Sequence, residues 1–175
     1  MGVHSNEGAG PRGQGAKAQG REGLAWYGAL MTAPTPEQRR FLDTRLVAYL
    51  TTVDAAGAPH AVPVCFALSG GTAYVVSGGE RNRTGERLDK RLRNLALNPK
   101  ASLAADHYED DWDRVAWVRV DGPAEVFTSG REHAEAVRLL RERYPQFDDM
   151  GLDGAPVIAL RIERVLSFGP LEVVG

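Results

Sequence analysis

The sequence has 175 residues, a formal net charge of −2, 43% hydrophobic residues and 25% charged residues. These values indicate one globular domain, two at most, with enough apolar material for a single core. A slightly acidic chain is not typical of a general nucleic-acid binder, which carries a basic excess. No apolar run approaches the roughly 20 residues that cross a bilayer, and the single cysteine, Cys65, provides no disulfide framework. We therefore expect a cytoplasmic protein with no nucleic-acid or membrane partner.

The first 34 residues differ in composition from the rest of the chain. They are rich in glycine and polar residues and show no apolar periodicity. Such a segment cannot bury enough apolar surface to offset the entropy lost on ordering. We predict a disordered or weakly ordered extension over residues 1–34 and one folded domain over residues 35–175. Met31 opens a more conventional beginning, so the sequence leaves the true start and the role of the extension open.

The folded domain is predicted to begin with a short helix. Thr35 is a suitable N-cap, and Gln38 stands at the position that completes a capping box. The helix is expected to continue to about Thr44, with Phe41 and Leu42 facing the core.

Three short β-strands should follow this helix. Residues 45–53, 60–68 and 72–77 are apolar and rich in β-branched side chains, and turn residues separate them. Their spacing predicts a meander of three antiparallel strands. Pro63 lacks the N–H that a central strand needs, so it indicates a sheet edge or a bulge in the second strand.

The second half is predicted to combine strands with two helices. Leucines at helical spacing predict a helix from Thr84 that stops at Asn98. A capping box of Ser129 and Glu132 predicts another helix, which ends at about Tyr144. Three further apolar strands are expected, at 101–108, 114–128 and 155–169. The total of about six short strands favours a sandwich or barrel over a doubly wound sheet.

Most familiar catalytic and metal-binding patterns are missing from the sequence. The four histidines, His4, His60, His107 and His133, show no metal-ligand spacing, so no metal site is expected. Neither a nucleophile elbow nor a P-loop occurs. Cys65 lies in an apolar strand, which favours an inert buried thiol over a nucleophile.

The segment ERNRTGERLDKRLRNLALNPK, residues 80–100, gathers seven lysines and arginines against three acidic residues. Arg83 and Thr84 lie near the predicted helix start, where free backbone N–H groups and the helix dipole favour an anion. On an ideal helix Arg91 and Asn94 share one flank, beside the leucine stripe. Because arginine presents a planar, permanently charged fork that suits phosphate, the pattern predicts a phosphate cradle.

Two other interpretations of this cationic segment stay open. It can be a solvated helix face stabilised by pairs such as Glu86 with Lys90. It can also be a basic patch for RNA, although no aromatic residues are interleaved with the cations to stack on bases.

Aromatic residues gather near the start of the strand predicted at 114–128. Alternation places Trp117 on one face of this strand and Ala116 and Val118 on the other. Packing in a core or interface is the expected role of Trp117. Trp112 lies in an acidic loop, which is otherwise expected to be solvated, and its ring is the better candidate for stacking on a planar ligand.

The order of motifs resembles that of a known protein family. TVDAAGAPHAVPV, RLRNLALNPKASL and DWDRVAWVRVDGPAEV follow one another along the chain. Together they resemble the split β-barrel proteins that bind flavin or deazaflavin and are related to pyridoxamine 5'-phosphate oxidase. Within that family they are most similar to the actinobacterial branch of F420-dependent oxidoreductases. The resemblance covers roughly residues 36–169.

This resemblance implies a mainly β fold with peripheral helices, a six-stranded antiparallel split β-barrel that forms a homodimer. Two cofactor sites would lie at the subunit interface. The cofactor ring would rest near Pro63, Val64 and Ser77, and its phosphate-bearing tail would meet Arg91 and Asn94.

Further residues are added to this implied site. The local chemistry of the cationic segment adds Arg83, Thr84 and Lys90 as candidates for the tail. The resemblance implies that Trp112 reaches the site from the partner subunit. No side chain is singled out as a catalytic acid or base.

The function implied by the resemblance is hydride transfer between F420 and an unidentified small organic substrate. F420 is favoured over FMN, the alternative cofactor, because its tail is longer and more anionic. If a proton is needed, Tyr74, His60 or solvent could supply it. A non-catalytic protein that binds F420, flavin or haem stays open, and haem iron would need His60 or His107. The C-terminal substrate motif of the pyridoxamine oxidases is not found here, which argues against vitamin metabolism.

Overall fold

The structure, a computed structural model, describes residues 33–78 and 90–172. This part contains three α-helices and two short 3-10 helices: α1 (Pro36–Thr44), α2 (Lys90–Leu97), α3 (Arg131–Arg143), η3 (Trp112–Arg114) and η4 (Pro145–Phe147). It also contains eight strands: β1 (Ala48–Val53), β2 (Pro59–Val64), β3 (Ala67–Ser69), β4 (Thr72–Val76), β5 (Lys100–His107), β6 (Ala116–Phe127), β7 (Val157–Arg161) and β8 (Arg164–Phe168). All strand pairs are antiparallel.

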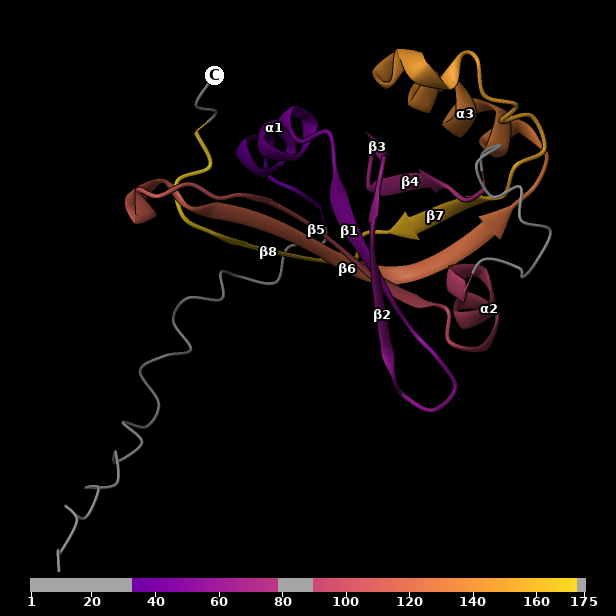
Figure 1. Ribbon diagram of the computed structural model, residues 1–175, viewed down its shortest axis with the longest axis horizontal. Helices are drawn as coiled ribbons and strands as arrows, with labels where there is room; N and C mark the ends of the chain where they lie inside the picture. Colours follow the sequence, from indigo (N-terminus) through magenta and orange to yellow (C-terminus); the bar gives the residue numbers. More distant parts are fainter. Residues whose placement is uncertain (1–32, 79–89, 173–175) are drawn as a thin grey trace, which may run out of the picture.

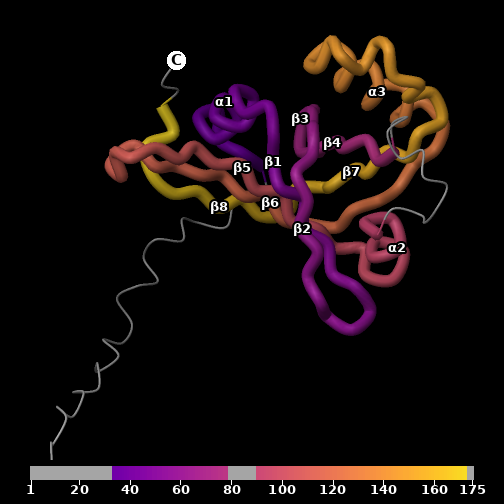
Figure 2. Tube along the Cα trace, in the orientation of Figure 1, coloured from indigo at the N-terminus to yellow at the C-terminus, as the bar shows by residue number. Residues whose placement is uncertain are grey.

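Strand β6 is shared by two sheets (Figure 1). The strand order is β2-β1-β5-β6-β7-β4-β3, and β8 pairs with β6 outside this path. The first half of β6 pairs with β5 and β8, and its second half pairs with β7. Helix α1 lies beside the first sheet, whereas α3 covers the second and α2 lies beneath the far end of β6 (Figures 1 and 2).

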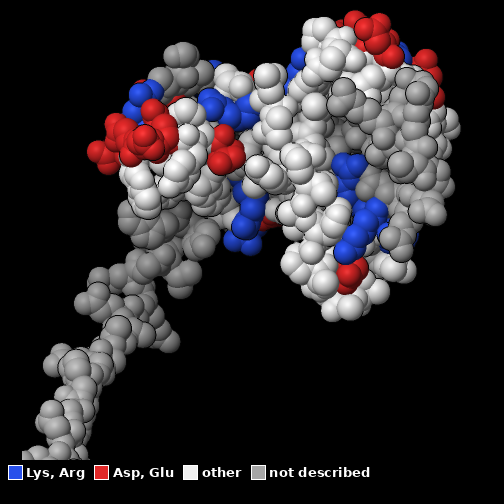
Figure 3. Space-filling view, viewed as in Figure 1, with Lys and Arg blue, Asp and Glu red and all other residues white. Residues whose placement is uncertain are grey.

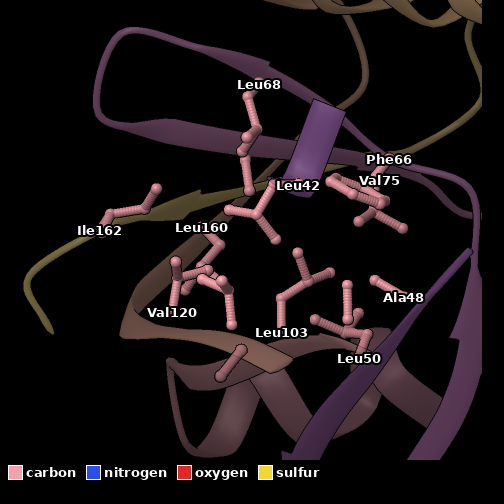
Figure 4. Close-up of a cluster of buried hydrophobic side chains, with 14 of the residues drawn as sticks. Leu42, Ala48, Leu50, Phe66, Leu68, Val75, Leu103, Val120, Leu160 and Ile162 are labelled. Carbon is pink, nitrogen blue, oxygen red and sulfur yellow. The ribbon is translucent and has the colours of Figure 1, made fainter. Parts of the chain in front are cut away.

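The main core lies where the inward faces of both sheets meet α1 (Figure 4). Leu42, Leu50, Leu103, Val120 and Leu160 come from five different elements and are fully buried there. A second cluster lies beneath α3 and contains residues of that helix, of β4 and of β7. Burial of these side chains is the principal stabilisation of both sheets.

Two local predictions are confirmed. Helix α1 begins with a capping box in which Thr35 Oγ1 accepts from Gln38 N at 3.2 Å and Gln38 Oε1 accepts from Thr35 N at 2.9 Å. In β6 the residues Ala116 and Val118 are fully buried, whereas Trp117 faces outward. The Trp117 ring stacks on Phe168 with centroids 6.4 Å apart.

The strand predicted at 60–68 is divided into β2 and β3. Phe66 N donates to the Tyr144 hydroxyl at 3.0 Å, and the carbonyl oxygens of Leu46 and Phe66 lie 3.0 and 2.9 Å from the same hydroxyl. The Tyr144 hydroxyl thus provides hydrogen-bond partners for main-chain groups that would otherwise need partners on a neighbouring strand. Since β2 pairs with β1 and β3 pairs with β4, the predicted three-stranded meander is wrong.

The strand predicted at 155–169 is also divided, into β7 and β8. At the break, Ile162 N donates to Gly71 O at 2.8 Å and Glu163 N donates to Asp121 O at 3.0 Å. The first bond reaches the turn between β3 and β4 and the second reaches β6, so together they turn the chain from the second sheet into the first. The described residues therefore hold eight strands where six were expected.

The capping box predicted for α3 does not form. The N-cap is Gly130, with a φ of 98° and no side-chain cap. Glu132 instead accepts from the Tyr74 hydroxyl at 2.9 Å and from both terminal nitrogens of Arg161, at 2.5 and 3.1 Å. A bidentate arginine bond is stronger than the cap it replaces.

Two predictions fall outside the described residues. These are the extension, of which residues 1–32 are not described, and the start of the helix predicted from Thr84. The described part of that helix, α2, ends at Leu97, beside the predicted stop at Asn98. Among the helices of residues 33–78 and 90–172, none has the length and apolarity to span a membrane.

Gly122 provides a test of the strand shared by the two sheets. A Cβ atom added here would stand 1.8 Å from the carbonyl oxygen of Arg161. Because this neighbour is backbone, we expect Gly122→Ala to lower the free energy of unfolding by about 2–3 kcal/mol in urea denaturation. The control is Gly71→Ala, where no heavy atom lies within 4 Å of the added Cβ. Equal stability of the two variants would contradict the role given to Gly122.

Candidate functional site

Helix α2 is fixed to the first sheet by a buried hydrogen bond. Asn94 Nδ2 donates to Thr52 Oγ1 at 2.9 Å, and the two residues are 3% and 0% exposed. Leu95, also buried, packs into the main core beside them. Asn94 therefore holds the helix in place, and its side chain has little surface left for a ligand.

The flank of α2 next to Asn94 carries two of the predicted cofactor residues. Arg91 Nη2 donates to Ser77 Oγ at 3.4 Å. Each of these two residues also has at least one other interaction. Ser77 directly follows β4, is 1% exposed and donates its N–H to Pro156 O at 2.8 Å. Lys90 Nζ lies 3.9 Å from Asp54 Oδ2, at the end of β1. The structure thus brings Ser77, Lys90, Arg91 and Asn94 together where α2 meets the ends of β1 and β4.

The charge distribution agrees with this grouping. Figure 3 shows a strip of lysine and arginine atoms on the surface beside α2. Arg93, on the same helix, is exposed and has no ion pair among the described residues. Arg83 and Thr84, the other candidates for the tail, lie outside the described residues.

Of the three residues predicted near the cofactor ring, Pro63 and Val64 occupy the edge strand β2, whereas Ser77 follows β4 and lies beside Arg91. Pro63 is exposed and pairs with Tyr49, whose side chain is 50% exposed. Val64 is 6% exposed, and its side chain belongs to the main core. A ligand at this edge would therefore meet the ring of Pro63 but only the main chain of Val64.

Trp112 lies far from this group within one chain. Trp112 is the first residue of η3, which follows β5, and is 75% exposed. Helix α2 precedes β5, so Trp112 lies beyond the opposite end of that strand. Its ring makes an edge contact with Tyr108 at a centroid distance of 6.4 Å. Figure 1 shows this hairpin end and α2 at opposite sides of the molecule.

Two residues that sequence reasoning missed complete the group, Thr52 and Asp54. Alternation from the buried Leu50 places Thr52 inward, and a buried hydroxyl needs a partner. That pattern could have led from Thr52 to Asn94. No comparable signal pointed to the approach of Lys90 to Asp54.

The two histidines considered as iron ligands differ in their surroundings. His107 has both ring nitrogens engaged, Nδ1 with Arg45 Nη1 and Nε2 with Glu109 Oε1, each at 3.0 Å. His60 is half-buried, and its buried Nδ1 has no hydrogen-bond partner among the described residues. The structure describes no group of three or more His, Cys, Asp or Glu side chains that could hold a metal ion.

Two other reactive groups are held in their protonated forms. Burial, followed by the bond to Glu132, raises the pKa of Tyr74, which lies beneath α3 and away from the α2 group. Burial also raises the pKa of Cys65 against the opposing charge of Arg143. A raised pKa keeps a thiol protonated and unreactive, in keeping with the inert role predicted for it.

The chain matches a family model described as pyridoxamine 5'-phosphate oxidase over residues 34–168. No curated protein sequence matches it at a significant level. Among solved structures, HutZ, a haem storage protein of Vibrio cholerae, has a TM-score of 0.62 at 21% identity, covering 81% of this chain and 99% of that chain. The FAD-binding protein of Mesorhizobium loti has a TM-score of 0.58 at 21% identity, covering 79% and 96%. These two likenesses confirm the predicted split-barrel fold.

A haem-binding protein of Mycobacterium smegmatis is also similar. Its TM-score is 0.63 at 26% identity, and the match covers 82% of this chain. The same match covers 57% of the mycobacterial protein, so this chain corresponds to little more than half of it.

The bond between Asn94 and Thr52 can be tested by a double-mutant cycle. We expect Asn94→Ala to lower the free energy of unfolding by about 1–3 kcal/mol, because it leaves the buried Thr52 hydroxyl unpaired. Thr52→Val should remove the same bond. The free energy of unfolding lost by the double variant should therefore be about 0.5–3 kcal/mol smaller than the sum of the losses of the two single variants. The measurement is urea denaturation of all four proteins. Strict additivity would show that the bond does not couple α2 to β1.

Proposed function

The chain belongs to the pyridoxamine 5'-phosphate oxidase family, and from this premise we propose that it is an oxidoreductase that binds coenzyme F420. One observation carries the proposal. Helix α2 is anchored so that Arg91 lies beside Ser77 and Lys90 beside Asp54, on a basic strip of an otherwise near-neutral protein. A concentration of fixed cations of this kind suits a cofactor with an anionic tail.

The donors present fit a phosphorylated tail. Arg91 offers a planar fork and Lys90 a compact charge, and both are groups that bind phosphate oxygens. Ser77, which is 1% exposed, helps to position Arg91. Arg83 and Thr84 are proposed as further contacts with the tail. F420 is preferred to FMN because a longer and more anionic tail makes fuller use of these cations.

The remaining residues have roles in holding the cofactor ring and the helix. Pro63 presents an apolar surface on the edge strand, and the main chain of Val64 lies beside it. Asn94 acts through the position of α2, which it fixes to Thr52. Trp112 from a second subunit is proposed to cover the site and exclude water.

A bound deazaflavin supplies hydride transfer to or from its ring, and the substrate would be a small organic molecule. The protein's contribution is to bind the tail, orient the ring and keep water away. No acid or base is assigned, because Tyr74 lies beneath α3 and is bonded to Glu132. A proton would then come from solvent or from His60.

A non-catalytic haem-binding protein is the second candidate. The mycobacterial relative at 26% identity is described as haem-binding. His60 has an unpartnered, buried Nδ1 among the described residues, whereas both nitrogens of His107 are engaged. If this chain binds haem, we therefore assign the iron ligand to His60 rather than to His107.

The cofactor is identified by titrating the purified chain with F420, FMN and haem while recording absorbance and fluorescence. We expect saturable F420 binding that weakens by about tenfold or more in Arg91→Ala, since a hydrogen bond to a charged group contributes about 1.5–3 kcal/mol. Arg93→Ala is the matched control, because this exposed arginine lies on the same helix. Haem binding lost in His60→Ala, without F420 or FMN binding, would favour the second candidate. Binding of none of the three would contradict both.

We also propose that the protein is a homodimer with its cofactor sites at the subunit interface. The support is a set of large apolar side chains exposed on and around the first sheet. Tyr49 is 50% exposed, Val47 50%, Leu46 65% and Phe168 39%. Exposed apolar surface of this kind marks an interaction site.

The dimer is tested with Tyr49→Glu. A carboxylate at this position cannot be buried without a partner, so we expect a monomer by sedimentation velocity and loss of cofactor binding. Ser69→Glu is the control for a general effect of charge, because Ser69 is exposed on β3, in the second sheet. A wild-type chain that sediments as a monomer at micromolar concentration would overturn this part of the proposal.

A further inference from the structure

A groove with a volume of about 780 Å³ lies along α3. One wall is the helix itself, and the opposite wall is formed by Asp148, Asp153 and Gly154 of the following loop. Thr128 and Ser129 line the end near the start of the helix. The volume is within the range of small-molecule sites. The proposed function uses none of these residues.

His133 presents an unsatisfied acceptor to this groove. Its side chain is 7% exposed, and Nε2 lies 2.8 Å from the carbonyl oxygen of Ala155. Because a carbonyl only accepts, Nε2 carries a hydrogen, and Nδ1 is the acceptor atom of this tautomer. Nδ1 has no hydrogen-bond partner among the described residues, and His133 is one of the residues that line the groove.

The start of α3 provides unsatisfied donors at the same end. Gly130 caps the helix without a side-chain hydrogen bond, and Glu132 is held by Arg161 and Tyr74. The first-turn N–H groups therefore have no side-chain acceptor among the described residues, and they carry the positive end of the helix dipole. The exposed hydroxyl of Ser129 is adjacent to them.

The charged side chains that line the groove form ion pairs, with the exception of one carboxylate. Arg138 pairs with Glu142, and Arg141 pairs with Asp153 at 3.3 Å. Asp148 has no ion pair among the described residues. The groove thus combines donors for an anionic group at the helix start with an imidazole acceptor and a spare negative charge. These features fit a ligand that carries one negative and one positive group.

We propose that this groove binds a free amino acid with an apolar side chain. The ligand carboxylate accepts from the first-turn N–H groups of α3 and from Ser129. The ammonium group donates to His133 Nδ1, and Asp148 adds a favourable potential for it. The apolar side chain lies along Ala134 and Val137, which line the middle of the groove. This site is independent of cofactor binding.

L-leucine is the probe, titrated calorimetrically into the full chain. Isocaproate, which lacks the amine, and isopentylamine, which lacks the carboxylate, are the matched ligands. We expect saturable binding of leucine that is about tenfold or more tighter than that of either analogue, because each loses a charge-assisted bond. Binding should weaken by a similar factor in Ser129→Ala and be unchanged in Ser69→Ala, an exposed serine on β3.

A second measurement does not depend on a variant of a buried residue. Leucine should shift the imidazole ¹⁵N resonance of His133 Nδ1 in the unaltered protein, and His133→Gln should lose binding if it folds. Arg91→Ala should bind leucine normally, which separates this proposal from that for the cofactor. Absence of saturable leucine binding, an affinity for either analogue equal to that for leucine, or an unchanged Nδ1 resonance would each overturn the proposal.

Discussion

Both sheets of this protein depend on one strand, β6, which crosses from the first sheet to the second at Gly122. The crossing brings the backbone of Arg161 so close that no side chain fits there. Two hydrogen bonds fix it, from Glu163 N to Asp121 O at 3.0 Å and from Ala124 N to Pro99 O at 2.9 Å. Because Pro99 follows α2 by two residues, the second bond also ties the cationic helix to the crossing. The position of the candidate site is thus a consequence of how the two sheets share a strand.

A second constraint, at the end of α3, fixes the other side of the site. Arg143 Nη2 donates to the carbonyl oxygens of Leu42 and Arg45 at 2.9 and 2.6 Å, and its guanidinium lies 4.5 Å from the Phe66 ring centroid. Tyr144 bonds the main chain of Phe66. The break between β2 and β3 is therefore held by the C-terminal end of α3, since Tyr144 follows Phe66 by 78 residues. Since β2 is an edge strand carrying Pro63, the same contacts orient the surface proposed to meet the cofactor ring.

Features determined by neighbouring residues were predictable from the sequence. The capping box of Thr35 and the alternation around Trp117 need only local geometry. The breaks that divide two predicted strands depend on Tyr144, Gly71 and Asp121, which are distant in sequence, so no local pattern indicates them. The capping box at Ser129 failed for the same reason, because Arg161 binds Glu132 more strongly than the helix start does.

The candidate site shows the same division between local and distant causes. Helical spacing correctly placed Arg91 and Asn94 on one flank of α2, beside the leucine stripe. It gave no means of distinguishing their roles, which depend on what β1 and β4 present to that flank. Thr52 makes Asn94 an anchor, whereas the Ser77 hydroxyl meets the Arg91 guanidinium. The fold therefore separates a residue that holds the helix from one that is proposed to hold a ligand.

This separation bears on the affinity expected of the proposed site. Because the buried bond to Thr52 and the packing of Leu95 already fix α2, a ligand would not have to order the helix that carries the cations. Lys90 lies 3.9 Å from Asp54, and both side chains are partly exposed. Such a pair contributes little in water, so an anion can draw the lysine away at small cost. Arg91 is held by contacts that include the Ser77 hydroxyl at 3.4 Å. The anchoring of the helix is therefore supplied by Asn94, Thr52 and Leu95, which the ligand is not proposed to touch.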